Sequence, residues 1–202
     1  MTEERMAEGR SSREKLDSYK AAMLWDKTAQ FRAVVYARLM RRMADAFGED
    51  VLDIAENIRR EDGKYSGDLS VDIIANEKKY NEDPSVLIKE MDEYWHRMGG
   101  AWGVTCICDF NGVPEKRYHE LRCVRCTYSE AFRSVNEEKI GITWCCWDMG
   151  FTSAFHPLFC QYMPLHMLKG DAVCYQIRKM ADSPEEQEWL NSTRHNGWRS
   201  WK

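Results

Sequence analysis

The most informative part of the sequence runs from Cys123 to Arg178: CVRCTYSEAFRSVNEEKIGITWCCWDMGFTSAFHPLFCQYMPLHMLKGDAVCYQIR. It holds six of the chain's eight cysteines, together with Asp148 and His156. It closes with a Gly170-Asp171 turn that has a cysteine three residues later. Thiol, imidazole and carboxyl groups gathered in one stretch favour a site for chemistry over packing alone.

Alternating apolar residues after Gly100 predict an antiparallel sheet. The expected strands are residues 102–110, 117–125, 158–165 and 172–179. The first two surround Asn111-Gly112-Val113-Pro114, a turn-prone sequence, and are expected to form a hairpin. Gly170 is expected to adopt a positive φ in the last turn, with Asp171 hydrogen-bonding that turn.

A helix is expected between the two strand pairs. Thr127 and Glu130 have the spacing of a capping box, which predicts a helix from Thr127 to about Lys139. Gly141 is expected to break or bend it, and residues 142–149 to form a short helix.

The sequence before Gly100 is expected to be helical, because apolar residues recur there at helical spacing. The stripes predicted to face the core are Phe31, Val35, Leu39 and Met43, flanked by Val34 and Phe47; then Val51, Leu52, Ala55 and Ile58; then Leu87, Met91, Tyr94, Trp95 and Met98. The glycines expected to end these helices are Gly48, Gly63 and Gly99-Gly100. Residues 64–82 are ambiguous. The predicted architecture is α+β, with a helical N-terminal part packed on a small antiparallel sheet.

Length and charge limit the classes of function. A chain of 202 residues predicts one domain, over residues 13–180, with a frayed N-terminus at 1–12 and a C-terminal tail at 181–202 that holds a short helix with an aromatic end. The 29 basic and 33 acidic residues leave a net charge of −4 without a basic cluster, so nucleic acid is not an expected partner. No apolar run approaches the ~20 residues of a membrane span. We therefore expect a cytoplasmic protein that has a small-molecule partner and no membrane partner; the sequence sets no oligomeric state.

The cysteines are expected to be reduced, because a chain of this size does not need disulfides to fold. Most are interpreted as buried core thiols, and no cofactor is expected. A four-thiolate zinc site is the alternative, because two closely spaced pairs on a hairpin can form a tetrahedron. Its ligands would be Cys106, Cys108, Cys123 and Cys126.

Cys126 is the first candidate nucleophile. It stands immediately before the predicted helix, where free N–H groups and the helix dipole would stabilise a thiolate. A purely packing role as a hydrophobic staple is the alternative. Glu130 is a candidate general acid or base, although its spacing from Thr127 also explains it as a capping partner.

Cys145 and Asp148 are three residues apart, so on a helix they would share a face and meet one substrate. His156 is a candidate for orienting a substrate, against a structural role in a turn. Alternation places Cys174, Gln176 and Arg178 on one strand face, where Arg178 would bind a carboxylate unless it is a surface residue. Cys174 is assigned to substrate binding together with Arg178.

Four short motifs follow one another in the chain: Cys126 with Glu130, Gly141-x-x-x-Cys145-x-x-Asp148, Phe155-x-Pro157 and Lys169-Gly170-Asp171-x-x-Cys174. In the order of these motifs the chain resembles the L-2-amino-thiazoline-4-carboxylic acid hydrolase family, over roughly residues 25–180. The resemblance implies hydrolysis of a C–N or C–S bond in a small cyclic amidine-like compound. A cysteine thiolate, or a water activated by Asp148 or a metal, would attack the ring.

The same arrangement also resembles small-molecule-binding domains related to vinyl reductases, which can act as sensors. A non-catalytic binding module and a zinc-stabilised interaction domain are therefore the alternatives to the hydrolase. An aspartate set among aromatic residues and thiols favours chemistry, because a binding pocket can be built without it.

Overall fold

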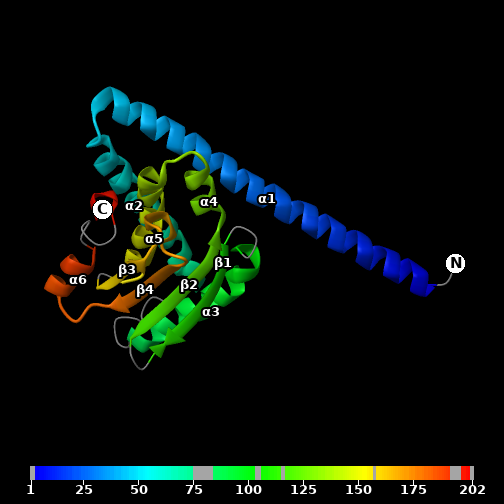
Figure 1. Ribbon diagram of the computed structural model, residues 1–202. Helices are drawn as coiled ribbons and strands as arrows, with labels where there is room; N and C mark the ends of the chain where they lie inside the picture. Colours follow the sequence, from blue (N-terminus) through cyan, green and yellow to red (C-terminus); the bar gives the residue numbers. More distant parts are fainter. Residues whose placement is uncertain are drawn as a thin grey trace.

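The computed structural model describes the backbone of residues 3–74, 84–102, 106–114, 117–156, 158–191 and 197–200, and most of the side chains within these ranges. This part of the chain forms an α+β fold, as the sequence predicts (Figure 1). Its α-helices are α1 (Glu3–Phe47), α2 (Val51–Ile74), α3 (Pro84–Trp102), α4 (Thr127–Ser134), α5 (Glu138–Ser153) and α6 (Pro184–Asn191). Its strands are β1 (Cys106–Val113), β2 (Tyr118–Cys126), β3 (Phe159–Leu165) and β4 (Cys174–Met180).

The four strands form one antiparallel sheet in the order β1-β2-β4-β3. The expected hairpin is confirmed as β1 and β2, and the last two expected strands as β3 and β4. The expected turn is wrong, however, because Asn111 and Gly112 pair with Glu120 and His119 inside the ladder. The chain reverses later, where the Arg117 N–H donates to the Pro114 carbonyl.

Helices cover one face of the sheet. α3 packs against β1 and β2, α5 packs against β3, and α2 forms a further layer on α5. α1 contacts α4 and α5 through its C-terminal half, and its N-terminal half extends away from the body (Figure 1). α1 takes in residues 3–12, for which the sequence predicts a frayed end.

The stripe predicted to face the core from α1 is mostly wrong: Val34 and Met43 are partly buried and pack against the core, but its other members are exposed. Phe31 is 68%, Val35 47% and Leu39 55% exposed, and Phe47 is exposed as well. The buried face of α1 is the opposite one, made of Ala29, Ala33, Ala37, Met40 and Ala44. Small side chains let α1 approach α4 and α5 closely, so size and not hydrophobicity decides which face is covered.

α2 does not end at Gly63, as expected from the sequence, but runs on to Ile74. A Cβ on Gly63 would lie 2.0 Å from the Trp147 carbonyl oxygen, and a Cβ on Gly150 would lie 1.9 Å from the Arg60 carbonyl oxygen. These glycines therefore permit the close crossing of α2 and α5. Residues 64–74 of the ambiguous segment are helical, and the rest of it lies outside the described residues.

Three other expected boundaries are wrong. α3 continues through Gly99-Gly100 to Trp102. The helix that begins at Thr127 ends at Ser134, because the chain turns at Val135 and Asn136, where Asn136 has φ 57°. α5 then runs through Gly141, where a Cβ would meet Leu168 and Phe132 at 2.6 and 2.7 Å. Met98 is predicted to face the core, and its side chain lies outside the described residues.

The C-terminal segment follows the prediction more closely. Gly170 has φ 101°, and Asp171 accepts a hydrogen bond from the His166 N–H at 2.7 Å. A 3₁₀ turn, η2 (Met167–Lys169), links β3 to this point, and η3 (Trp198–Ser200) follows α6. Trp198 is buried and donates from Nε1 to Asp53 of α2 at 2.8 Å. None of the described helices is long and apolar enough to span a bilayer.

Candidate functional site

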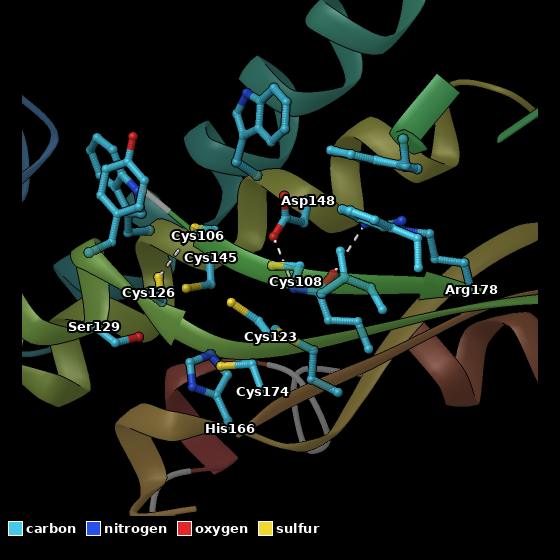
Figure 2. A pocket seen from close by; sticks show the side chains of 18 of the residues that line it. Cys106, Cys108, Cys123, Cys126, Ser129, Cys145, Asp148, His166, Cys174 and Arg178 are labelled. Carbon is cyan, nitrogen blue, oxygen red and sulfur yellow. Dashed lines mark hydrogen bonds between the residues drawn. The ribbon is translucent and has the colours of Figure 1, made fainter. Parts of the chain in front are cut away.

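A cavity of about 300 Å³ lies between the sheet and the helices that cover it (Figure 2). All four strands and helices α1 to α5 contribute to its wall. Six thiols line it: Cys106, Cys108, Cys123, Cys126, Cys145 and Cys174. None of the eight cysteines is in a disulfide. Of the residues proposed from sequence, five meet here: Cys126, Cys145, Asp148, Cys174 and Arg178.

Strand alternation and register bring the thiols together. Cys106 and Cys108 point inward from β1 while Ile107 and Asp109 are exposed, as the alternating pattern predicts. Cys106 pairs across the ladder with Cys126, and their sulfur atoms are 3.7 Å apart. Cys123 likewise pairs with Cys174 of β4.

The four thiols of the zinc alternative therefore lie close together. Hydrogen bonding to Cys106 and burial raise the pKa of the Cys108 thiol. The hydrogen bond with Cys106 lowers the pKa of Cys123, but the bond with Cys108 and burial raise it more. Among the described residues no group of three or more His, Cys, Asp or Glu side chains is arranged to hold a metal ion.

Cys126 occupies the N-cap position of α4 but makes no side-chain capping bond. Hydrogen bonding to the Cys106 thiol, followed by burial, raises its pKa well above the ordinary value, although bonds with Ser129 oppose this. The expectation of a lowered pKa at this helix end is wrong, because contact with a second neutral thiol and loss of solvent outweigh the helix end.

The predicted capping box is also wrong. Thr127 is the first residue of α4, and its hydroxyl donates to Asp26 of α1. Glu130 is exposed and accepts from Arg125 Nε at 3.1 Å, outside the cavity. Glu130 is therefore a surface ion-pair residue outside this cavity, and it lines a second, smaller pocket with Cys126.

Cys145 and Asp148 lie on the cavity side of α5, so the prediction that they share a face is confirmed (Figure 2). The protein encloses both residues, yet each keeps accessible surface, because that surface opens into the cavity. Burial raises the pKa of both groups. The nearby Arg178 opposes the shift at Asp148. Cys146 points the other way and is fully buried packing.

Arg178 is sealed within the protein, with 1% of its surface exposed. Its Nε donates to Gln161 Oε1 at 2.9 Å, its Nη2 donates to Gln176 Oε1 at 3.2 Å, and its Nη1 is 3.3 Å from His119 Nδ1. Its guanidinium also stacks over Trp95, 4.7 Å from the ring centroid. Burial lowers the pKa of Arg178 to about 10, so it stays charged at neutral pH.

Gln176 joins this cation to the acid. Its Nε2 donates to Asp148 Oδ2 at 3.2 Å, while its Oε1 accepts from Arg178. The amide is therefore oriented by both partners, with its donor toward the carboxyl and its acceptor toward the guanidinium. The strand alternation that places Cys174, Gln176 and Arg178 on one face is confirmed.

Aromatic side chains supply much of the remaining wall: Trp95, Phe110, Tyr128, Trp144 and Trp147. The rings of Trp95 and Phe110 stack with centroids 5.7 Å apart, and Arg59 lies over the Trp144 ring at 4.2 Å. Four of these rings come from helices, and five of the six thiols come from strands β1, β2 and β4. Flat, polarisable walls of this kind bind apolar rings well.

His156 does not line the cavity. Its Nδ1 accepts from the Leu158 N–H at 3.0 Å, and burial lowers its pKa. His166, which no motif in the sequence singles out, does line the cavity and is 2% exposed. Its place depends on how β3 ends and on the η2 turn, for which the sequence carries no spacing signal.

No family model and no curated protein matches this sequence. Solved structures that match this chain include the following two. The phenol-responsive sensory domain of the transcription activator PoxR, solved with phenol, is 12% identical with a TM-score of 0.50, over 79% of this chain and 81% of that one. A trafficking protein particle complex subunit 3 from Naegleria fowleri, covalently bound to palmitic acid, is 12% identical with a TM-score of 0.46, over 77% of this chain and 96% of that one.

Neither of these structures is a 2-amino-thiazoline-4-carboxylate hydrolase, and that resemblance stays a prediction. At 12% identity the likeness to the PoxR sensory domain shows the fold alone. The chain thus has a fold that a ligand-responsive sensory domain also adopts, with a thiol-lined and aromatic-lined cavity inside it.

Proposed function

We propose that this protein is a small-molecule-binding domain of the sensory type, and that its ligand lies in the cavity between α5 and the sheet. The observation that carries the proposal is the cavity of about 300 Å³, whose wall combines aromatic rings and thiols with one carboxyl group and three arginines. Ligand pockets are mostly apolar concavities with a few placed polar groups. The neighbour of similar fold is a phenol-responsive sensory domain, which supports the same reading.

The thiols support binding over nucleophilic catalysis. A thiol attacks as its thiolate, and a catalytic cysteine therefore needs a lowered pKa. Here the pKa of Cys126 and Cys145 is raised well above the ordinary value, and burial raises the pKa of Cys174 to about 12. Neutral thiols act as small polarisable wall groups instead.

A titration of purified protein with small aromatic compounds, followed by calorimetry and by the fluorescence of the cavity tryptophans, tests the proposal. Phenol, indole and 2-naphthol are suitable first probes. Cys145→Phe should weaken binding at least 10-fold, because the side chain at this position faces the cavity and would fill part of it. Ile107→Phe adds the same ring on the exposed face of β1 and should leave binding unchanged. Equal binding by the two variants would place the ligand elsewhere.

Hydrolysis of a cyclic amidine is the second candidate, favoured by Cys145 and Asp148 facing one cavity. A water activated by Asp148 fits the raised thiol pKa values better than a thiolate. Under this reading Asp148→Asn should lower turnover of 2-aminothiazoline-4-carboxylate by roughly 10² to 10⁴, while Cys126→Ser should leave it nearly unchanged. Absence of turnover by wild type, with binding of the aromatic probes, would leave the binding domain alone.

A further inference from the structure

Among the described residues, only one of the two carboxyl oxygens of Asp148 has a hydrogen-bond partner. Gln176 Nε2 donates to Asp148 Oδ2, and among the described residues no hydrogen bond reaches Oδ1. Asp148 nevertheless lines the cavity and keeps accessible surface there. A buried carboxyl oxygen that faces a cavity is costly unless a donor meets it, so this atom marks where a ligand donor belongs.

The charge of this acid already has a counter-ion. Arg178 acts on Asp148 directly through its charge, and also through the Gln176 amide between them. The guanidinium itself is not available to a ligand, because it is 1% exposed and bonds to Gln161, Gln176 and His119. In the part of the wall formed by Asp148, Gln176 and Arg178, we therefore assign only a hydrogen-bond acceptor, Asp148 Oδ1, to the ligand.

A charged ligand group beside Asp148 would disturb this balance. A cation there would leave the Arg178 charge without compensation, and an anion would be repelled by the carboxylate. A neutral donor, such as a hydroxyl or a ring N–H, satisfies the free oxygen without adding charge. Elsewhere in the wall, burial and thiol–thiol bonds raise the thiol pKa values and keep those groups neutral, while Arg32 and Arg59 add positive charge.

Volume and wall shape limit the rest of the molecule. A cavity of 150 Å³ accepts benzene, so one of about 300 Å³ has room for a fused pair of rings. The rings of Trp95, Phe110 and Trp147 provide flat apolar surface for such a ligand.

We infer that the ligand is a flat aromatic molecule of one or two rings with an uncharged hydrogen-bond donor, and that Asp148 Oδ1 accepts this bond. The inference rests on the proposed binding function and narrows its ligand class. Asp148 is then the specificity-determining residue, and the Arg178–Gln176 pair holds it in position.

Three naphthalenes of one ring system test it by calorimetry: 2-naphthol has a donor, 2-methoxynaphthalene has an oxygen acceptor but no donor, and 2-methylnaphthalene has neither. Wild type should bind 2-naphthol about 10- to 100-fold more tightly than the other two, the range expected for a hydrogen bond to a charged acceptor. In Asp148→Asn the amide oxygen can still accept from Gln176, while its NH₂ faces the ligand as a donor. The preference for 2-naphthol over 2-methoxynaphthalene should then fall to within about 3-fold. Asp109→Asn, on the exposed face of β1, should keep the wild-type preference.

The possible outcomes distinguish failure of this inference from failure of the proposed binding function. Equal affinity of wild type for all three compounds, or an unchanged preference in Asp148→Asn, would overturn the donor rule and leave a binding cavity. Failure of wild type to bind any of them or any earlier aromatic probe would overturn the binding function itself. Circular dichroism and thermal unfolding of each variant establish that the comparison is made on folded protein.

Discussion

At the residue scale, the cysteines distinguish a binding wall from a reactive centre. All six cavity thiols line one cavity, and burial contributes to the raised pKa of Cys108, Cys123, Cys126, Cys145 and Cys174. A thiol with a raised pKa is almost wholly protonated at neutral pH and reacts slowly. The sequence could suggest a cluster of thiols, but not their ionisation, which depends on what surrounds them.

We expect iodoacetamide at pH 7.5 to modify these five cysteines at least 100-fold more slowly in the folded protein than in urea, because their thiolate content is low. Mass spectrometry of peptides after timed quenching gives the rate at each position. One cavity cysteine that is modified in the folded protein as fast as in urea would contradict the account and restore a nucleophile.

The free energy of unfolding should depend on pH through His166. Burial, followed by the nearby Lys169 charge, lowers the pKa of His166 to about 4. Between its ordinary value of about 6.5 and pH 4 the unfolded chain therefore binds a proton that the folded protein does not, so the free energy of unfolding falls as the pH drops. The expected loss is up to about 3 kcal/mol.

The matched variant is His166→Asn, which keeps an acceptor for the Leu168 N–H that His166 Nδ1 now satisfies at 3.1 Å. Urea unfolding at pH 7 and pH 4.5 should show a smaller loss in the variant than in wild type. The same loss in both proteins would assign the acid sensitivity to other groups.

At the element scale, the sequence predicted most helices and strands, while the side of each helix that is buried depends on its neighbours. Phe31, Val35 and Leu39 have helical spacing, yet α1 packs through its alanines. Periodicity identifies an apolar stripe, but it cannot show whether another element has room to approach it. The predicted helix end at Gly63 fails for the same reason, because Gly63 permits a close crossing with α5, a helix distant in sequence.

Substitutions on the two faces of α1 should therefore lower the free energy of unfolding by different amounts. Phe31→Ser should change the free energy of unfolding by less than about 0.5 kcal/mol, because Phe31 is already exposed. Ala33→Leu should cost about 1–3 kcal/mol, because Ala33 has no exposed surface and a larger side chain must displace the packed helices. Chemical denaturation measures both; a greater loss for Phe31→Ser would mean that the exposed stripe is covered.

The α2 and α5 crossing should be the least tolerant contact of the fold. Gly150→Ala would place a methyl group against the Arg60 backbone and should cost several kcal/mol, at or above the ~1–3 kcal/mol of ordinary overpacking. Gly48→Ala tests backbone conformation alone, because Gly48 has φ 90° with nothing near its Cβ position. Equal, small effects at both positions would show that the helices can separate without penalty.

At the scale of the whole molecule, the α+β architecture and five of the seven site candidates could be anticipated from sequence. Cys126, Cys145, Asp148, Cys174 and Arg178 meet in the cavity because alternation and helical spacing are local rules that survive folding. Glu130 and His156 do not line it, because their positions depend on local partners, Arg125 and the Leu158 N–H. The aromatic wall and His166 come from elements far apart in the chain, which one sequence cannot bring together.

Asp148 connects the cavity to global stability. Because burial raises its pKa, the folded protein holds a proton longer than the unfolded chain as the pH rises above about 4. The free energy of unfolding of wild type should therefore fall, relative to that of Asp148→Asn, between pH 4 and pH 7. Paired urea titrations measure this difference, and a constant difference would mean that Asp148 is not desolvated.

The position of a bound ligand tests the central claim most directly. Crystals grown with 6-bromo-2-naphthol, collected at the bromine absorption edge, would locate the bromine atom independently of the protein phases. We expect one strong anomalous peak inside the cavity, among Trp95, Trp147 and Cys145, with the hydroxyl toward Asp148. Bromine found only on the surface, with the cavity closed or filled by ordered water at saturating ligand, would contradict the account.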